Sequence, residues 1–346
     1  MRLHTPTLLA SCASLAAAQS GSLQQVLDQG GLTDYADLLQ KVNSPLLTSG
    51  NNLIIYATIN AAFDDNNSTI KRRDEADEAA ATAAIQASNS EAPASTSKRD
   101  TSSLGSSPGS SLGCGPGVSR VTFLNDPRWV NLGPGRNQTV VEKQLPSSAG
   151  PVVIAGFGDG IRVTGADLPF DRGVVRPIAD FFKLPGTVSQ TLPFVGAEKF
   201  KAALEKAGIL PGLDNTTAIT VLAPSDSVFG KLGNVTAAQL KQHIIVGRVV
   251  YSTQFRDGQV LPTLGGGSVT VSVQGGVISV GGARIVASDA IIKNGVIHTI
   301  DRPLTPATPT TPVPSTVPTA AGATVRPLAW QLATAFGLVA FVGQIW

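Results

Sequence analysis

Two histidines, His243 and His298, are the side chains of this sequence best suited to proton transfer or metal binding near neutral pH. Together with Ser225 and Asp289, His243 can be written as a Ser–His–Asp triad, in which the histidine removes a proton from the serine. Nothing in the spacing of these residues requires a triad. The sequence also lacks an H-E-x-x-H motif and a Cys/His pair at zinc spacing.

Plainer roles fit the same residues. Ser225 and Asp226 follow Pro224 and suit the N-terminal cap of a helix. His243 falls in an amphipathic helical pattern and His298 in an apolar strand pattern, so both suit hydrogen-bonded positions near a core. We therefore predict structural roles, with no catalytic residue, no cofactor, no metal and no enzymatic activity.

Sugar hydrolysis is the other chemistry to consider, because it needs two carboxylates that face each other across a cleft. Four aspartates of the first half are candidates: Asp159, Asp167, Asp171 and Asp180. None of them lies in a recognisable motif. An enzyme that modifies wall polysaccharide is therefore kept as the alternative function.

Length and composition indicate the class of protein. A chain of 346 residues is long enough for two domains. Charged residues make up 14% and the net charge is +2, with no stretch that concentrates Lys and Arg, so a nucleic-acid partner is not expected. Cys12 lies in the first segment, which leaves Cys114 without an internal disulfide partner.

Both ends of the chain look like processing signals. Residues 1–18 begin with basic side chains, continue as a short apolar run and end in alanines, as a secretory signal peptide does. Residues 307–327 are rich in Thr and Pro, and residues 328–346 are apolar and uncharged. This order predicts a glycosylphosphatidylinositol (GPI) anchor, and a single membrane-spanning helix is the alternative. The attachment candidates are Ser315, Ala320, Ala321 and Gly322.

The segment from about 65 to 113 is rich in Ser, Ala, Asp and Glu and is predicted to be a disordered insertion. Two basic clusters in it end at Arg73 and Arg99 and could be cleaved by a secretory processing protease. Five Asn-x-Ser/Thr sequons predict N-glycosylation: Asn66, Asn67, Asn137, Asn215 and Asn234.

An internal repeat organises the rest of the chain. Residues 52–63 resemble residues 218–229, and an amphipathic helix precedes each. Further on, residues 173–178 match residues 295–300. The separation is 110 residues from Phe63 to Gly173 but 66 from Phe229 to Gly295, so the first copy carries the insertion.

The second copy has readable local signals. Thr236 and Gln239 predict a capping box for a helix that continues through residues 240–245. Residues 269–273 alternate as a half-buried strand does. Asn294-Gly295 between two apolar runs predicts a hairpin whose turn uses positive backbone angles.

Three segments of this copy resemble the fasciclin-like (FAS1) domain, in its fungal type. Residues 219–229 are similar to its first signature, residues 240–247 to its central region, with Gln242 where tyrosine is usual, and residues 285–306 to its second signature. The matching motif residues are Pro224, Asp226, Phe229, His243, Asp289, Asn294, Gly295 and His298. The first copy departs from this pattern, because Arg176 stands where the second copy has His298.

The resemblance implies an α+β fold of two tandem FAS1 domains, each a β-sandwich-like wedge with packed helices, over residues 19–185 and 186–306. It also implies a cell-surface glycoprotein that mediates cell adhesion or association with the cell wall or extracellular matrix. The expected partners are surface proteins or wall polysaccharides, with the membrane reached through the GPI anchor. A vacuolar or endomembrane location is the remaining alternative.

Overall fold

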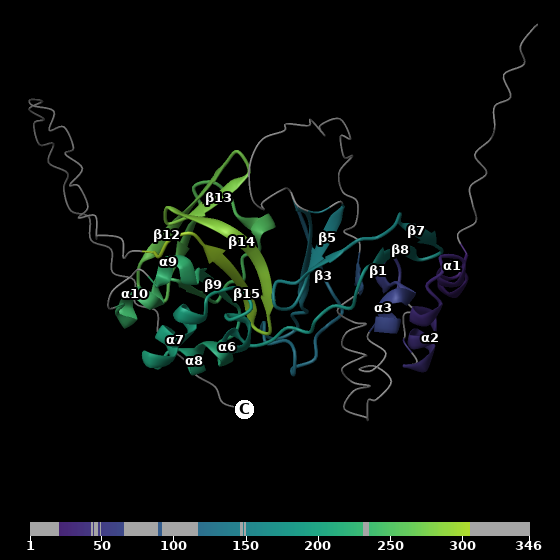
Figure 1. The fold of residues 1–346 in the computed structure, drawn as a ribbon, viewed down its shortest axis with the longest axis horizontal. Helices are drawn as coiled ribbons and strands as arrows, with labels where there is room; N and C mark the ends of the chain where they lie inside the picture. The colour runs from purple at the N-terminus through teal and green to yellow at the C-terminus, as the bar shows by residue number, and fades with distance from the viewer. Residues whose placement is uncertain are drawn as a thin grey trace, which may run out of the picture. The chain divides into compact units, whose positions relative to one another are not determined.

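The computed structural model describes residues 21–42, 44, 48, 50–65, 89–91, 117–145, 148, 150–230 and 235–304 (Figure 1). These residues belong to one compact unit, Met1–Ala307. The predicted signal peptide, the Thr/Pro stretch, the C-terminal tail and most of the predicted insertion lie outside the described residues. So do the attachment candidates, both basic clusters, Cys114 and the sequons at Asn66, Asn67 and Asn234.

The fold is mixed α+β, as the sequence predicts. The first repeat contains two four-stranded sheets, and the second contains one seven-stranded sheet. The first repeat is formed by α1 (Leu23–Gln29), α2 (Thr33–Lys41), β1 (Leu53–Thr58), α3 (Asn60–Asp65), β2 (Asn89–Glu91), β3 (Val118–Val121), β4 (Thr139–Gln144), β5 (Pro151–Ile154), β6 (Gly160–Arg162), β7 (Leu168–Phe170) and β8 (Gly173–Ile178). Strand β2 falls within the segment predicted to be disordered.

The second repeat has the short 3-10 helix η2 (Ser252–Gln254) and, before and within its strands, a set of α-helices. They are α6 (Val188–Thr191), α7 (Glu198–Lys206), α8 (Leu210–Asn215), α9 (Asp226–Phe229) and α10 (Ala237–Lys241). The strands are β9 (Ile219–Pro224), β10 (Ile244–Val246), β11 (Val260–Pro262), β12 (Ser268–Gln274), β13 (Val277–Val280), β14 (Ala283–Ile292) and β15 (Gly295–Ile300). Among the residues described, no helix is long and apolar enough to cross a membrane.

The repeat seen in the sequence is also a repeat of strand pairing. Strand β1 runs parallel to β8 with Leu53 opposite Gly173, and β9 runs parallel to β15 with Ile219 opposite Gly295. The outer strands agree as well, since β2 and β7 flank the first pair as β10 and β14 flank the second, all antiparallel. The orders are therefore equivalent, β2-β1-β8-β7 and β10-β9-β15-β14.

The two repeats differ in one strand. In the second, the long strand β14 pairs with β15 and also with β13, which joins all seven strands. In the first, the corresponding stretch is divided into β6 and β7. A single bridge, Val163 to Ile178, remains where the second repeat pairs Ile285 with Ile300.

Alternation along the parallel strands separates two layers of core. Ile219, Val221 and Ala223 of β9 pack with the helices α6–α10, whereas Leu222 packs with β11–β13 on the other face. Strand β1 has the same pattern, because its odd-numbered residues pack with α1 and α2 and its even-numbered ones with β4–β6. Burial of such a strand on both faces explains why it reads as a continuous apolar run.

Two local predictions need correction. The capping box of Thr236 and Gln239 is present, but α10 ends at Lys241 and Ile244 already belongs to β10, so the predicted helix is too long. The hairpin before β15 is also present, yet its turn is Lys293-Asn294, and Gly295 is the first residue of the strand. Glycine is required there because a Cβ would collide with the carbonyl oxygen of Ile219.

Candidate functional site

Asp289 is the most deeply enclosed carboxylate among the predicted site residues. It lies in β14 within the second of two register shifts, between Ala287 and Ala290, has a positive φ of 71° and is 0% exposed. One carboxylate oxygen accepts a hydrogen bond from the backbone N–H of Ser252 at 2.7 Å. The other accepts one from the ammonium of Lys143 at 3.0 Å.

Lys143 comes from β4 of the first repeat and is itself 3% exposed. Its ammonium also donates to the hydroxyl of Ser288 at 2.7 Å and to the carbonyl of Ser288 at 3.3 Å. Burial acts to raise the pKa of Asp289, but the Lys143 charge and the hydrogen bonds from Ser252 outweigh it, so this pKa is lowered. The ion pair therefore joins the first repeat to the second within one compact unit.

His298 has no nitrogen left for catalysis. Its Nδ1 accepts a hydrogen bond from the backbone N–H of Asp289 at 3.3 Å, and its Nε2 donates to the carbonyl of Val250 at 2.8 Å. These two partners fix the neutral form with the proton on Nε2. Complete burial lowers the pKa of His298, against the opposing effect of the nearby Asp289 carboxylate.

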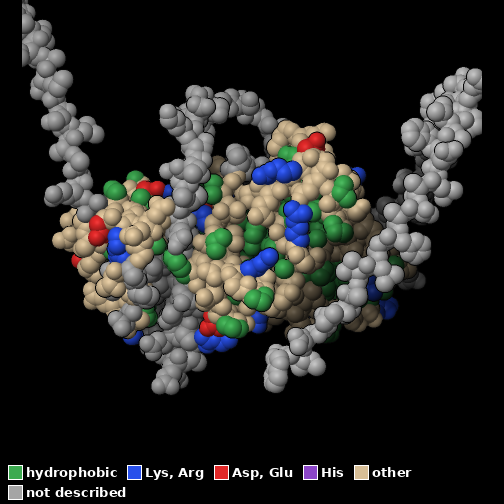
Figure 2. All heavy atoms as spheres, turned by 180° about the vertical axis from the view of Figure 1, so that it is seen from behind, with side chains coloured by type: hydrophobic (Ala, Val, Ile, Leu, Met, Phe, Trp, Pro, Cys, Tyr) green, Lys and Arg blue, Asp and Glu red, His purple; other side chains and the backbone are tan. Residues whose placement is uncertain are grey.

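His243 is also fully engaged. It lies in the turn between α10 and β10, where its Nδ1 donates to the carbonyl of Gln239 at 3.0 Å and its Nε2 accepts from the backbone N–H of Leu304 at 2.9 Å. Burial lowers its pKa from 6.5 to about 4. Both histidines are at most 1% exposed, and the face drawn in Figure 2 shows no histidine side chain.

The structure does not assemble the triad. Ser225 bonds through its hydroxyl to Ser227, and in the described part of the chain no hydrogen bond joins Ser225, His243 and Asp289 to one another. Ser225 is the N-cap residue of α9, although its side chain makes no capping bond. Asp226 instead caps α7, because its carboxylate accepts from the backbone N–H groups of Glu198 and Lys199.

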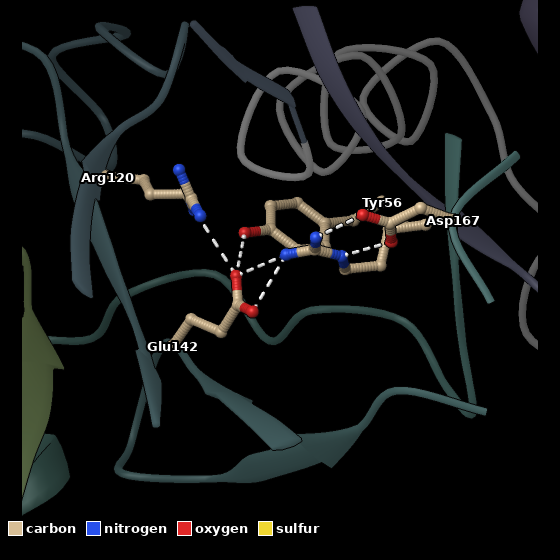
Figure 3. Close-up of polar contacts among 5 residues, drawn as sticks. Tyr56, Arg120, Glu142 and Asp167 are labelled. Carbon is tan, nitrogen blue, oxygen red and sulfur yellow. Dashed lines mark hydrogen bonds and ion pairs between the residues drawn. The ribbon is translucent and has the colours of Figure 1, made fainter. Parts of the chain in front are cut away.

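A second polar cluster occupies the equivalent place in the first repeat (Figure 3). Arg176 pairs with Tyr56 across the strands as His298 pairs with Leu222, and Asp167 precedes Arg176 by nine residues as Asp289 precedes His298. The guanidinium of Arg176 bonds to Asp167 at 2.7 Å on one side. In both repeats an aspartate and a hydrogen-bonding side chain occupy these two positions. In the first repeat the two side chains form an ion pair, whereas in the second the backbone N–H of Asp289 donates to His298.

Glu142 completes this cluster from β4. Its carboxylate accepts from Arg176 at 2.6 Å, from the hydroxyl of Tyr56 at 3.0 Å and from Arg120 at 3.2 Å, as Figure 3 shows. Burial, reinforced by the Glu142 charge, raises the pKa of Tyr56. Sequence reasoning missed Glu142 and Lys143 because charged residues on a strand normally indicate a solvent-facing side.

Each of the four aspartates considered for sugar hydrolysis has a partner of another kind. Asp159 pairs with Lys183, Asp167 with Arg176 and Asp171 with Arg172, and Asp180 accepts from the backbone N–H of Phe181. Within the described ranges, no group of three or more His, Cys, Asp or Glu side chains could hold a metal ion.

A shallow cavity of about 400 Å³ lies between the β3–β4 loop and Thr217, which is two residues before the start of β9. The residues that line it include Asn125, Pro127, Asn131, Arg136, Asn137 and Thr217. Amide and guanidinium groups of this kind form hydrogen bonds with a ligand, while proline rings supply apolar contact. This cavity is the candidate binding site.

Two predicted sequons fall among the described residues, and their surroundings differ. Asn215 is exposed at the end of α8, and Thr217 of the same sequon is exposed as well. Asn137 donates to the carbonyl of Thr122 at 2.9 Å, and Thr139 of its sequon is 6% exposed in β4. Asn215 also uses its side-chain amide, which donates to the carbonyl of Pro211 at 2.9 Å. The two sites therefore differ in exposure, because Asn137 is half-buried and leaves less room for a glycan.

Glycopeptide mass spectrometry of the secreted chain should find Asn215 occupied and Asn137 largely empty. The reason is that a glycan on the half-buried Asn137 would have to fit against the folded β3–β4 loop, whereas Asn215 is exposed. An Asn137→Gln variant serves as the control and should leave the glycan mass unchanged. Full occupancy of Asn137 in folded protein would contradict this expectation.

Comparison with known proteins identifies the second repeat. The family model described as the fasciclin domain matches residues 196–306. Residues 196–306 are a fasciclin domain. Ser225, His243, Asp289 and His298 lie inside this domain, whereas Lys143 and the cluster around Arg176 lie outside it.

Two fungal proteins are similar to this chain over about 200 residues. A fasciclin-like arabinogalactan protein, CTB11, of Cercospora beticola is 30% identical over 194 residues, which cover 54% of this chain and 52% of that protein. A fasciclin-like arabinogalactan protein of Arthroderma benhamiae is 30% identical over 206 residues, or 57% of this chain and 48% of that protein. The chain thus spans about half the length of these relatives.

More distant similarities reach other kingdoms. Human periostin is 31% identical over 150 residues, which cover 39% of this chain and 18% of periostin. A solved FAS1 domain pair from the insect cell adhesion molecule Fasciclin I aligns with 82% of this chain and 97% of its own, at 17% identity and a TM-score of 0.35.

Proposed function

We propose that this protein is a secreted, GPI-anchored surface glycoprotein that mediates cell adhesion or attachment to the cell wall or matrix. The fasciclin domain at residues 196–306 is the observation that carries the proposal. The protein acts by binding, through surface proteins or wall polysaccharides, and not by catalysis. The predicted signal peptide, sequons and apolar C-terminal tail supply the route to the surface.

We propose further that the first repeat is a degenerate FAS1 domain, in tandem with the fasciclin domain at residues 196–306. Its four strands follow the same order and directions as β10, β9, β15 and β14, and its parallel pair has the same register. Its ion pair of Arg176 and Asp167 stands where the fasciclin domain has His298 and Asp289.

The wall-modifying enzyme is the weaker candidate. Each of the four aspartates considered for hydrolysis is engaged with a cation or a backbone N–H group. The histidines of the fasciclin domain have both ring nitrogens bonded to backbone groups. Binding at an open surface needs none of these side chains to be free.

Phospholipase C specific for phosphatidylinositol should release the chain from intact cells, and adhesion of those cells should fall with the amount released. A variant that ends before Leu328 is the control, because it should appear in the medium without treatment. Two results would overturn the proposal: adhesion that persists after complete release, or liberation of sugars from wall polysaccharide by the purified chain.

A further inference from the structure

The cavity between the β3–β4 loop and β9 lies directly beside a sequon. The amide of Asn131 donates to the backbone carbonyl of Asn215 at 3.2 Å, so the loop contacts the backbone of the glycosylation residue. The attachment atom, Nδ2 of Asn215, donates to the carbonyl of Pro211 at 2.9 Å, and a glycosylated amide keeps one N–H for this bond. Thr217, the hydroxyl residue of the same sequon, lines the cavity. Asn215 and Thr217 are two residues apart, a separation of about 7 Å at most along the backbone.

The lining of this cavity has the chemistry of a sugar site. Asn125 supplies an exposed amide and Arg136 an exposed guanidinium. The amide nitrogens of Asn131 and Asn137 already donate to backbone carbonyls, so these two side chains offer mainly their amide oxygens as acceptors. Sugar hydroxyl and N-acetyl groups can bond to both kinds of group. Pro127 offers an apolar surface for the C–H face of a sugar ring.

Charge and size narrow the ligand further. The cavity lining contains no Asp or Glu, which argues against a cation, and one arginine is too little charge for a polyanion. Its volume of about 400 Å³ is at the small end of the range of ligand sites, which run from roughly 300 to 1,000 Å³. A ligand of one or two sugar rings suits these limits.

We propose that this cavity holds the first sugars of an N-linked glycan on Asn215 of the same chain. The proposal rests on the proposed function in one respect, since the glycan is added only in the secretory pathway. Attachment makes the contact intramolecular, so weak contacts with the cavity suffice. The glycan then joins the β3–β4 loop of the first repeat to the fasciclin domain.

Hydrogen exchange of the secreted, full-length chain tests this contact. Amides of residues 125–137 should exchange about tenfold faster in Asn215→Gln than in the wild type, because the loop opens more readily without the sugar. Trimming the wild-type glycan to its first sugar with an endoglycosidase should leave most of the protection. Asn234→Gln is the matched control and should leave the loop unchanged.

A double variant of the exposed residues Asn125 and Arg136 separates the glycan contact from other effects. Asn125→Ala with Arg136→Ala should remove the protection given by the glycan, yet change little when Asn215→Gln is already present. An unoccupied Asn215, or equal exchange in the wild type and Asn215→Gln, would overturn the proposal. If the wild type and Asn215→Gln exchange equally while adhesion is normal, only this glycan contact is refuted. If the chain carries no N-glycan and is not secreted, the proposed function is refuted as well.

Discussion

Replacing Lys143 by methionine should lower the free energy of unfolding by about 3–5 kcal/mol, the usual cost of leaving one member of a buried ion pair without its partner. Lys143 and Asp289 are 2% and 0% exposed in their side chains, and their charged atoms are 3.0 Å apart. Without the ammonium, the carboxylate loses its counter-charge and keeps the bond from the backbone N–H of Ser252. Equilibrium urea denaturation of the purified chain measures the change.

Lys183 provides the matched control, because it forms an ion pair with Asp159 in the same repeat with side chains 59% and 44% exposed. Lys183→Met should cost about 1 kcal/mol or less, since exposed pairs contribute little. Adding Asp289→Asn to Lys143→Met should recover part of the loss by removing the stranded charge. Equal costs for the two lysine variants would show that the buried pair does not hold the repeats together.

The Lys143 contact also bears on the meaning of the fasciclin signature in this chain. Asp289 is a motif residue of the domain at 196–306, yet its charge is neutralised by a lysine outside that domain. Apolar contacts accompany this pair, since Val141 of the first repeat packs with Tyr251, Ile291 and Val296. The first repeat thus supplies both a counter-charge and an apolar contact to the buried face of the fasciclin domain.

Much of the fold could be predicted from local sequence. The apolar runs, the glycine after α7 and the repeated Gly-Val and Gly-Val-Ile segments locate the parallel strand pairs, because each signal acts over a few residues. Gly208, two residues after the end of α7, has a positive φ of 67°, as glycines that end helices commonly do. The motif residues of the fasciclin domain are likewise recognisable by type and spacing alone.

The remaining features depend on contacts between distant segments. Lys143 and Asp289 are 146 residues apart, and no local pattern links them. In the first repeat, β6 and β7 take the place of the single strand β14, and no change in residue composition marks the break between them. The end of α10 also depends on tertiary structure, because Ile244 and Ile245 suit either a helix or a strand until β9 is available to pair with them.

Lowering the pH from 7 to 4 should remove about 3 kcal/mol of stability through His243 alone. Its pKa is about 4 in the folded chain, against 6.5 for an unperturbed histidine. The unfolded chain therefore takes up a proton first as the pH falls. The stabilising contribution is complete above about pH 6.5 and is lost as the pH approaches 4.

His243→Gln isolates this contribution. A glutamine can accept from the backbone N–H of Leu304 and donate to Gln239 but does not titrate, so the variant should lose only about 1–2 kcal/mol at pH 7 and show a shallower decline toward pH 4. His298 remains in both proteins and cancels in the comparison. Urea denaturation at several pH values would give parallel curves if His243 were not the titrating group, and adhesion lost without loss of stability would point instead to a direct role in binding or catalysis.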